Sequence, residues 1–205
     1  MKVGNQLFTA EGPRVVTMLA GQGFGILLDL KFHDIPNTVA RATVAAAELP
    51  KVRLLTLHAL GGVAMMQAAR AAVGNKKNRP ALLGVTLLTS MDEKALRGVG
   101  IARSPSETVL ALTRLAQEAG LDGVVASGQE ARAIRAQCGP NFLIVTPGVR
   151  PVSASANDQS RVTTPSEAIE AGADYLVVGR PITESDDPRA SALAIAREIA
   201  SARRR

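Results

Sequence analysis

The sequence predicts an α/β protein of the (β/α)8 TIM-barrel family, with about seven strand–helix units present. Short apolar runs alternate with helix-like segments along all 205 residues, which is typical of a parallel sheet. Polar residues follow many of these runs, as a barrel requires, whereas a doubly wound sheet places them mainly at one switch point. A closed barrel has eight strands and typically about 250 residues, so this chain is one unit short.

Seven runs are predicted to be strands because each is short, apolar and bounded by Gly, Pro or polar residues. The run Ile26-Leu27-Leu28 lacks alternation, which indicates a strand buried on both faces. No G-x-G-x-x-G follows the first strand, which weakens the dinucleotide-binding alternative. The predicted strands are Lys2–Gly4, Ile26–Lys31, Leu54–His58, Leu82–Thr89, Gly123–Ala126, Leu143–Thr146 and Tyr175–Val178.

Start and stop signals between these runs predict the helices. Ser104-Pro105-Ser106-Glu107 and Thr164-Pro165-Ser166-Glu167 are capping boxes with Pro at the first helical position. No change of composition marks a boundary, so residues 1–205 are predicted to form a single domain. The predicted helices run from Gly12-Pro13 to Gly21, over Asn37–Glu48, Val63–Ala72, Glu107–Glu118 and Gln129–Gln137, and from Pro188 to about Ala202, with one more opened by the box at Thr164.

Composition excludes several classes of protein. The single cysteine, Cys138, rules out an internal disulfide framework and suits a reducing cytoplasm. It lies far along the chain from both histidines, so no metal site is indicated. No apolar run approaches the roughly 18 residues of a membrane span. The net charge of +6 comes with only 2% aromatic residues, which argues against nucleic acid; an anionic small substrate explains part of the charge equally well.

The stretch Gly25–Val39, GILLDLKFHDIPNTV, carries the strongest chemical signal. Side chains alternate along a strand, so Asp29 and Lys31 are predicted to share a face at its end, with Asp34 in the following loop. A structural ion pair is the simplest interpretation, since buried charges are costly unless paired. A carboxylate-held ammonium is also an oriented positive charge and a proton donor.

The ten residues Asp29–Thr38 resemble the active-site strand of the orotidine 5'-phosphate decarboxylase family, its bacterial form in particular. Val145–Pro151 and Leu176–Pro181 resemble the VTPGxRP and VxGRP signatures of the same family, and the likeness covers essentially residues 2–200. It implies decarboxylation of orotidine 5'-phosphate to UMP in pyrimidine biosynthesis, with no cofactor and no metal. It also implies that the family's first strand and helix are missing ahead of Lys2.

The resemblance assigns roles to particular residues. Lys31 is the implied proton donor, Asp29 lies beside the departing carboxylate, and Lys2 and Asp34 complete a Lys-Asp-Lys-Asp array. The position of Gly179 and Arg180 after the last strand is itself the usual phosphate locus of barrels. His58 is interpreted as a structural strand-end histidine. The implied substrate-binding residues are Ile35, Thr38, Thr89, Arg150, Gln159, Gly179 and Arg180.

In the family, residues like Asp34 and Thr38 reach into the neighbouring subunit's site, which implies a homodimer with shared active sites. Two alternatives stay open at this point. One is a truncated nucleotide-binding barrel with little or no activity. The other is a metal-dependent phosphosugar decarboxylase of the same superfamily, although His33 and Asn37 stand beside the motif where that enzyme needs a further acidic ligand.

Overall fold

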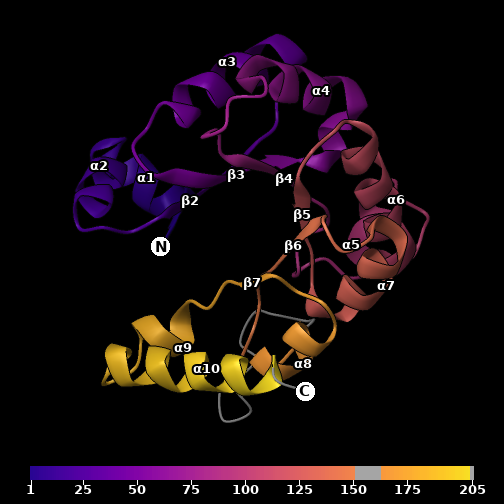
Figure 1. Ribbon diagram of the computed structural model, residues 1–205. Helices are drawn as coiled ribbons and strands as arrows, with labels where there is room; N and C mark the ends of the chain where they lie inside the picture. The colour runs from indigo at the N-terminus through magenta and orange to yellow at the C-terminus, as the bar shows by residue number, and fades with distance from the viewer. Residues whose placement is uncertain (151–162, 204–205) are drawn as a thin grey trace. The chain divides into compact units, whose positions relative to one another are not determined.

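The computed structural model describes residues 1–150 and 163–203. Seven strands occur in these residues, and they follow one another in the sheet in their order along the chain, with parallel pairing (Figure 1). This topology confirms the predicted class, a (β/α) barrel-type protein of about seven units. The strands are β1 (Lys2–Gly4), β2 (Ile26–Phe32), β3 (Val52–His58), β4 (Ala81–Val85), β5 (Gly123–Val125), β6 (Leu143–Thr146) and β7 (Tyr175–Leu176).

Helices stand between the strands, and both predicted capping boxes are formed. The Thr164 hydroxyl accepts from Glu167 N while the Glu167 carboxylate accepts from Thr164 N, and Ser104 and Glu107 do the same. The helices are α1 (Asn5–Glu11), α2 (Arg14–Gly21), α3 (Pro36–Ala47), the 3₁₀ turn η1 (Ala59–Gly61), α4 (Gly62–Val73), α5 (Glu93–Gly98), α6 (Pro105–Glu118), α7 (Gly128–Cys138), α8 (Pro165–Glu170), α9 (Arg180–Thr183) and α10 (Pro188–Ala202).

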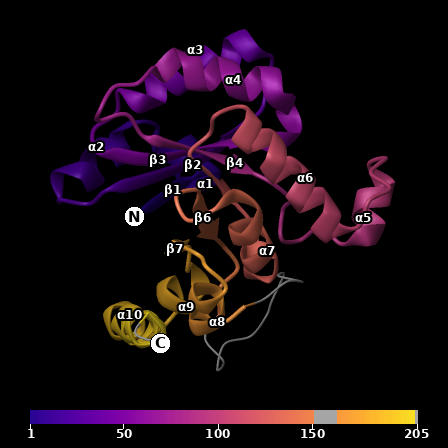
Figure 2. The same ribbon diagram turned by 45° about the vertical axis from the view of Figure 1, so that its right-hand side comes forward.

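Contacts divide the chain into two compact units. Unit 1 consists of Met1–Thr86 and Leu112–Val124, and unit 2 of Leu87–Ala111 and Val125–Arg205. In unit 1, α3 and α4 pack side by side on the strands that they connect, as Figures 1 and 2 both show. The single domain predicted for the whole chain stays a prediction. The largest buried side chains of unit 1 include Ile26, Leu28, Leu55, Leu57, Met65, Met66, Leu82 and Leu83.

Unit 2 has its own buried residues. Ala126 N donates to Val145 O, which continues the parallel ladder between β5 and β6. Val149, Ala168 and Ala173 form a cluster against which Leu176 and Val178 pack. Helix α10 packs on α8 and α9.

Two aspartates link neighbouring strands by accepting hydrogen bonds from an arginine and from a strand backbone N–H. Asp122 accepts two hydrogen bonds of 2.6 Å from the guanidinium of Arg79 and one of 2.7 Å from Leu82 N. Asp174 likewise accepts from Arg135 at 2.8 Å and from Ile144 N at 2.7 Å. Each carboxylate stands just before a strand and binds the backbone of the strand that precedes it. The result is a repeated charge-assisted link between adjacent strands.

Some predicted boundaries are wrong. The helix predicted from Gly12-Pro13 is preceded by a second helix, α1, and Gly12 separates the two with φ of 62°. The strand predicted over Leu82–Thr89 ends at Val85, and a turn closed by Met91 N on Leu88 O follows. The short helices α5 and α9 are absent from the predicted helices, because single turns carry too little periodicity to recognise.

No helix within residues 1–150 and 163–203 is long and apolar enough to cross a membrane.

Asp122→Ala is expected to lower the free energy of unfolding by about 2–3 kcal/mol, because Arg79 and Leu82 N lose a partly buried, charged partner. Urea unfolding followed by circular dichroism measures the change. Glu93→Ala is the control, since its ion pair with Arg97 at 3.6 Å is largely exposed and is worth less than about 0.5 kcal/mol. Equal effects of the two substitutions would contradict the role given to Asp122.

Candidate active site

Strand β2 is irregular where its charged residues begin. The pairing of β2 with β3 shifts register between Leu28 and Phe32, and Lys31 has φ of 52°, in the left-handed region. A positive φ is uncommon for any residue but glycine and marks a bulge or a constrained site. The plain strand alternation predicted for Asp29 and Lys31 is therefore wrong, although the two side chains do meet.

Asp29 lies at the centre of a charged cluster. Lys31 Nζ donates to Asp29 Oδ1 at 2.9 Å, and Lys2 Nζ lies 3.4 Å from Asp29 Oδ2. The hydroxyl of Thr56 donates to Asp29 Oδ1 at 3.0 Å. The Asp29 side chain is 13% exposed, compared with 30% for Lys31 and 38% for Lys2. One largely buried carboxylate thus holds two ammonium groups. These four residues, Asp29, Lys31, Lys2 and Thr56, are called the Asp29 cluster.

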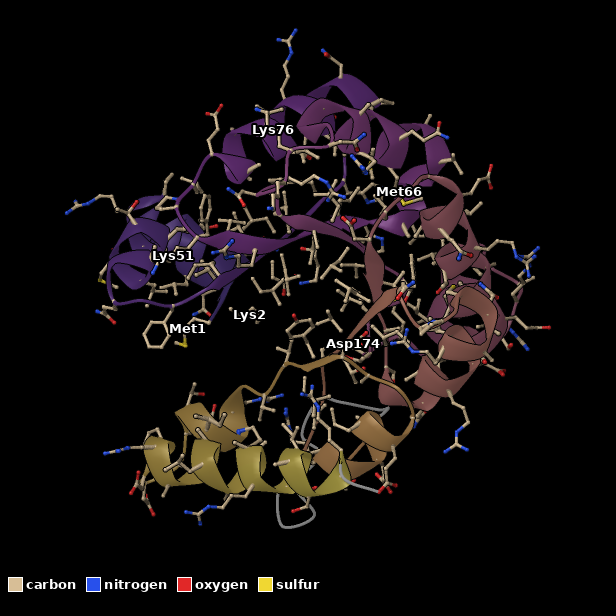
Figure 3. All side chains as sticks on the ribbon, in the orientation of Figure 1. Met1, Lys2, Lys51, Met66, Lys76 and Asp174 are labelled. Carbon is tan, nitrogen blue, oxygen red and sulfur yellow. The ribbon has the colours of Figure 1, made fainter. Side chains whose placement is uncertain are left out.

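Strand pairing brings Lys2 to this cluster. Gly4 of β1 lies opposite Asp29 of β2 in a parallel register, and a methyl group at Gly4 would come within 2.8 Å of Lys2 Nζ. Glycine at this position leaves room for the Lys2 side chain to fold back toward Asp29. Figure 3 labels Lys2 beside Met1 at the start of β1. Distant segments of the chain therefore supply the two ammonium groups.

The charges decide the ionisation of Asp29. Burial alone raises the pKa of this carboxyl, but the hydrogen bond and charge of Lys31, the charge of Lys2 and the Thr56 hydroxyl outweigh it, so the pKa of Asp29 lies below its ordinary value. Asp29 is a carboxylate at neutral pH. Its fixed negative charge orients the two ammonium groups of Lys31 and Lys2 toward one point.

A pocket of about 340 Å³ brings three of the predicted site residues together: Lys31, Asp34 and Thr38. Asp34 is exposed and accepts a hydrogen bond from Ile35 N, and it makes no ion pair with the side chains that the structure describes. The described cluster therefore has one carboxylate at the Lys31 ammonium, not two. Ile35, the residue after Asp34, is 65% exposed.

The two histidines lie near Lys31, His33 just after β2 and His58 at the end of β3. The rings of His33 and His58 stack with centroids 5.3 Å apart and 22° between their planes. Nδ1 of His58 accepts from Leu60 N at 3.4 Å and so caps η1. Burial, together with the charges of His33 and Lys31, lowers the pKa of His58 to about 4. The capping contact agrees with the structural role predicted for His58.

The predicted phosphate-binding residues belong to unit 2. Arg150 is 5% exposed, donates from Nη1 to Val149 O, and its buried Nε has no partner among the residues that the structure describes. Gly179 precedes α9, and a Cβ there would meet nothing within 4 Å. Thr89 lies in the turn after β4, four residues beyond the strand end, which corrects its predicted strand-end position. Gln159 lies outside the described residues.

Sequence reasoning missed Thr56 and Gly4. Thr56 interrupts the apolar run Leu54–Leu57 and shares a strand face with His58. This polar residue within an apolar run is the only signal in the sequence, and the structure shows that its hydroxyl is buried. Gly4 gives no signal until β1 and β2 are paired. No group of three His, Cys, Asp or Glu side chains within residues 1–150 and 163–203 is placed to hold a metal ion.

The topology and the Asp29 cluster define a (β/α) barrel-type protein with a lysine–aspartate site at the end of β2. A family model described as orotidine 5'-phosphate decarboxylase / HUMPS matches residues 1–195. The chain therefore belongs to this family of enzymes, the carboxy-lyase family that Asp29–Thr38 predicts.

Individual relatives agree with the family match. A Nitrosococcus oceani protein named orotidine 5'-phosphate decarboxylase is 56% identical over 201 residues, which cover 98% of this chain and 86% of the relative. A protein of the same name from Moorella thermoacetica is 56% identical over 97% of this chain and 81% of the relative. The crystal structure of the Lactobacillus acidophilus enzyme of that name matches with a TM-score of 0.84 at 40% identity, covering 97% of this chain and 85% of that one.

The free energy of unfolding is expected to fall as the pH drops from about 6.5 to about 4, because unfolded His58 binds a proton at a higher pH than the folded one does. Partial exposure limits the loss to on the order of 1 kcal/mol. Asp29 contributes in a lower window, since its stabilising charge is lost only as the pH falls below its ordinary pKa. His58→Asn keeps an acceptor for Leu60 N and should remove the loss of stability between about pH 6.5 and 4. Urea unfolding at pH 7, 5.5 and 4.5 compares the wild type with this variant. An identical pH dependence in both would refute this assignment.

Proposed function

We propose that this protein decarboxylates orotidine 5'-phosphate to UMP in pyrimidine biosynthesis, the reaction for which its relatives are named. The observation that carries the proposal is the Asp29 cluster, in which one buried carboxylate holds Lys31 at 2.9 Å and Lys2 at 3.4 Å. Lys31 of this cluster also lines a pocket of about 340 Å³. The cluster supplies what the reaction needs, a positive charge and a proton at one point in space.

The chemistry breaks one carbon–carbon bond. The bond from C6 of the pyrimidine to its carboxylate breaks, CO2 leaves, and the electron pair stays on C6. The ammonium of Lys31 stabilises this carbanion as it forms and then donates a proton to C6, which yields UMP. The neutral amine regains a proton from solvent. Asp29 orients the Nζ of Lys31 through their hydrogen bond, and Lys2 supplies a second positive charge beside Asp29.

Phosphate recognition is assigned to the loops of unit 2. A guanidinium matches the geometry of a phosphate, and Arg150 offers a buried Nε that has no partner among the described residues. Gly179 and Arg180 open α9 after β7, where barrels commonly bind phosphate. We assign Arg150, Gln159, Gly179 and Arg180 to the phosphate and base edge of the nucleotide, Thr89 to the pyrimidine, and Ile35 to substrate binding.

The proposed active form is a cytoplasmic homodimer in which Asp34 and Thr38 serve the neighbouring subunit's site. Both residues are exposed, and Ile35 between them is an apolar side chain with 65% of its surface exposed. Light scattering at micromolar concentration tests this assembly, and a monomer would remove the shared-site role of Asp34.

The direct test of the function is the loss of orotidine 5'-phosphate absorbance, with UMP identified by chromatography. Turnover that survives a metal chelator supports the proposal. Loss of turnover with the chelator would favour the metal-dependent relative, and nucleotide binding without turnover would favour an inactive barrel.

Lys31→Ala is expected to lower kcat by about 10²–10⁴-fold, the usual contribution of a positioned proton donor. The Kd for UMP should change little. UMP has no charge at C6, so the ammonium matters most in the transition state. Lys51→Ala is the matched control, because Lys51 is the other described non-glycine residue with positive φ, at 55°, and lies outside the cluster. Near-normal kcat in folded Lys31→Ala would overturn the mechanism.

Arg180→Ala is expected to weaken binding of UMP by about 1.5–3 kcal/mol, the worth of a hydrogen bond between charged groups. Uridine, which has no phosphate, should bind both proteins alike. Isothermal titration calorimetry measures both ligands, with the exposed Arg189→Ala as control. Equal losses for UMP and uridine would place Arg180 outside the phosphate site.

A further inference from the structure

Thr56 is a fully buried polar residue in the middle of β3. Its neighbours in sequence, Leu55 and Leu57, are buried as well, so the strand would be apolar here without it. A buried hydroxyl costs free energy unless it finds hydrogen-bond partners. Thr56 finds both of its partners in the irregular part of β2.

The two hydrogen bonds of Thr56 have a fixed direction. Lys31 N donates to Thr56 Oγ1 at 3.0 Å, so the hydroxyl must use its own hydrogen elsewhere. It donates this hydrogen to Asp29 Oδ1 at 3.0 Å, the same oxygen that accepts from Lys31 Nζ at 2.9 Å. One hydroxyl therefore connects the backbone of Lys31 to the carboxylate that holds the Lys31 ammonium.

These contacts compensate the unusual backbone of Lys31. A positive φ at a non-glycine residue costs of order 1–3 kcal/mol and persists only where the surroundings hold it. The register shift in β2 takes Lys31 N out of the regular strand ladder, and Thr56 Oγ1 accepts the hydrogen bond instead. The hydroxyl thus supports the bulge and the ion pair at once.

We propose that Thr56 is a positioning residue, whose hydroxyl holds the Lys31 backbone and the Asp29 carboxylate in the relative geometry that proton transfer requires. This inference rests on the proposed function for its kinetic consequences. The two hydrogen bonds of Thr56 are not explained by burial alone. The hydroxyls of Thr113 and Thr146 are also buried, and they have no partner among the residues described. Thr56 acts through Lys31 and Asp29 and has no assigned contact with substrate.

The test compares Thr56→Val, which keeps the shape of the side chain, with Thr56→Ser, which keeps the hydroxyl. We expect kcat to fall about 10- to 100-fold in the Val variant, as a small displacement of a catalytic group does, with KM changed less than about threefold. The Ser variant should recover kcat to within about threefold of the wild type. Thr113→Val removes another buried hydroxyl of unit 1 and serves as the control, with unchanged kcat.

A second readout does not depend on turnover. Removing the Thr56 hydrogen bond takes away one of the interactions that lower the pKa of Asp29, so the carboxyl ¹³C titration of Asp29 should move to higher pH in Thr56→Val and stay in place in Thr56→Ser and Thr113→Val. Thr56→Ala gives the same readouts if the Val variant does not fold.

A wild-type protein without decarboxylase activity would overturn the proposed function and leave the Asp29 titration to decide the role of Thr56. An unchanged Asp29 titration in folded Thr56→Val would overturn the positioning role, and so would an active wild type whose Thr56→Val variant keeps normal kcat.

Discussion

The structure of the site depends on one largely buried negative charge, that of Asp29. A buried carboxylate is tolerated only when charges and hydrogen bonds compensate its loss of water. Lys31, Lys2 and the Thr56 hydroxyl supply that compensation from three neighbouring strands, β2, β1 and β3. The parallel order of these strands is therefore what assembles the site. Removing either lysine would leave Asp29 with less compensation in a place that water hardly reaches.

The same charge explains why β2 departs from a regular strand. A regular strand would give Lys31 N a partner in the ladder, whereas the bulge directs it to Thr56 and turns Lys31 into a left-handed conformation. The cost of that conformation is offset by the ion pair and the two hydrogen bonds of Thr56. Backbone strain of this kind is common where a side chain must be held in one geometry. Here it holds an ammonium group over a carboxylate.

Much of the fold was predictable because periodicity and capping are local signals. Short apolar runs separated by helix-like segments predicted the seven strands. The capping boxes at Ser104 and Thr164 predicted two helix starts correctly. The pairing of Asp29 with Lys31 was predicted for the wrong reason, since no local pattern reveals a bulge. The sequence marks Thr56 only as a hydroxyl within an apolar run, because its role arises only when β3 lies beside β2. Short helices such as α9 carry too few residues to show a period.

In the proposed mechanism, Lys31, held by Asp29, transfers a proton to and from C6 of the pyrimidine. The most direct measurement is exchange of the C6 hydrogen of UMP for deuterium in D2O, followed by proton NMR with the wild type and Lys31→Ala. This exchange observes the proton transfer alone, without CO2 release. We expect the wild type and Lys51→Ala to catalyse the exchange and Lys31→Ala to lose it. Equal exchange rates in the wild type and Lys31→Ala would rule out Lys31 as the proton donor.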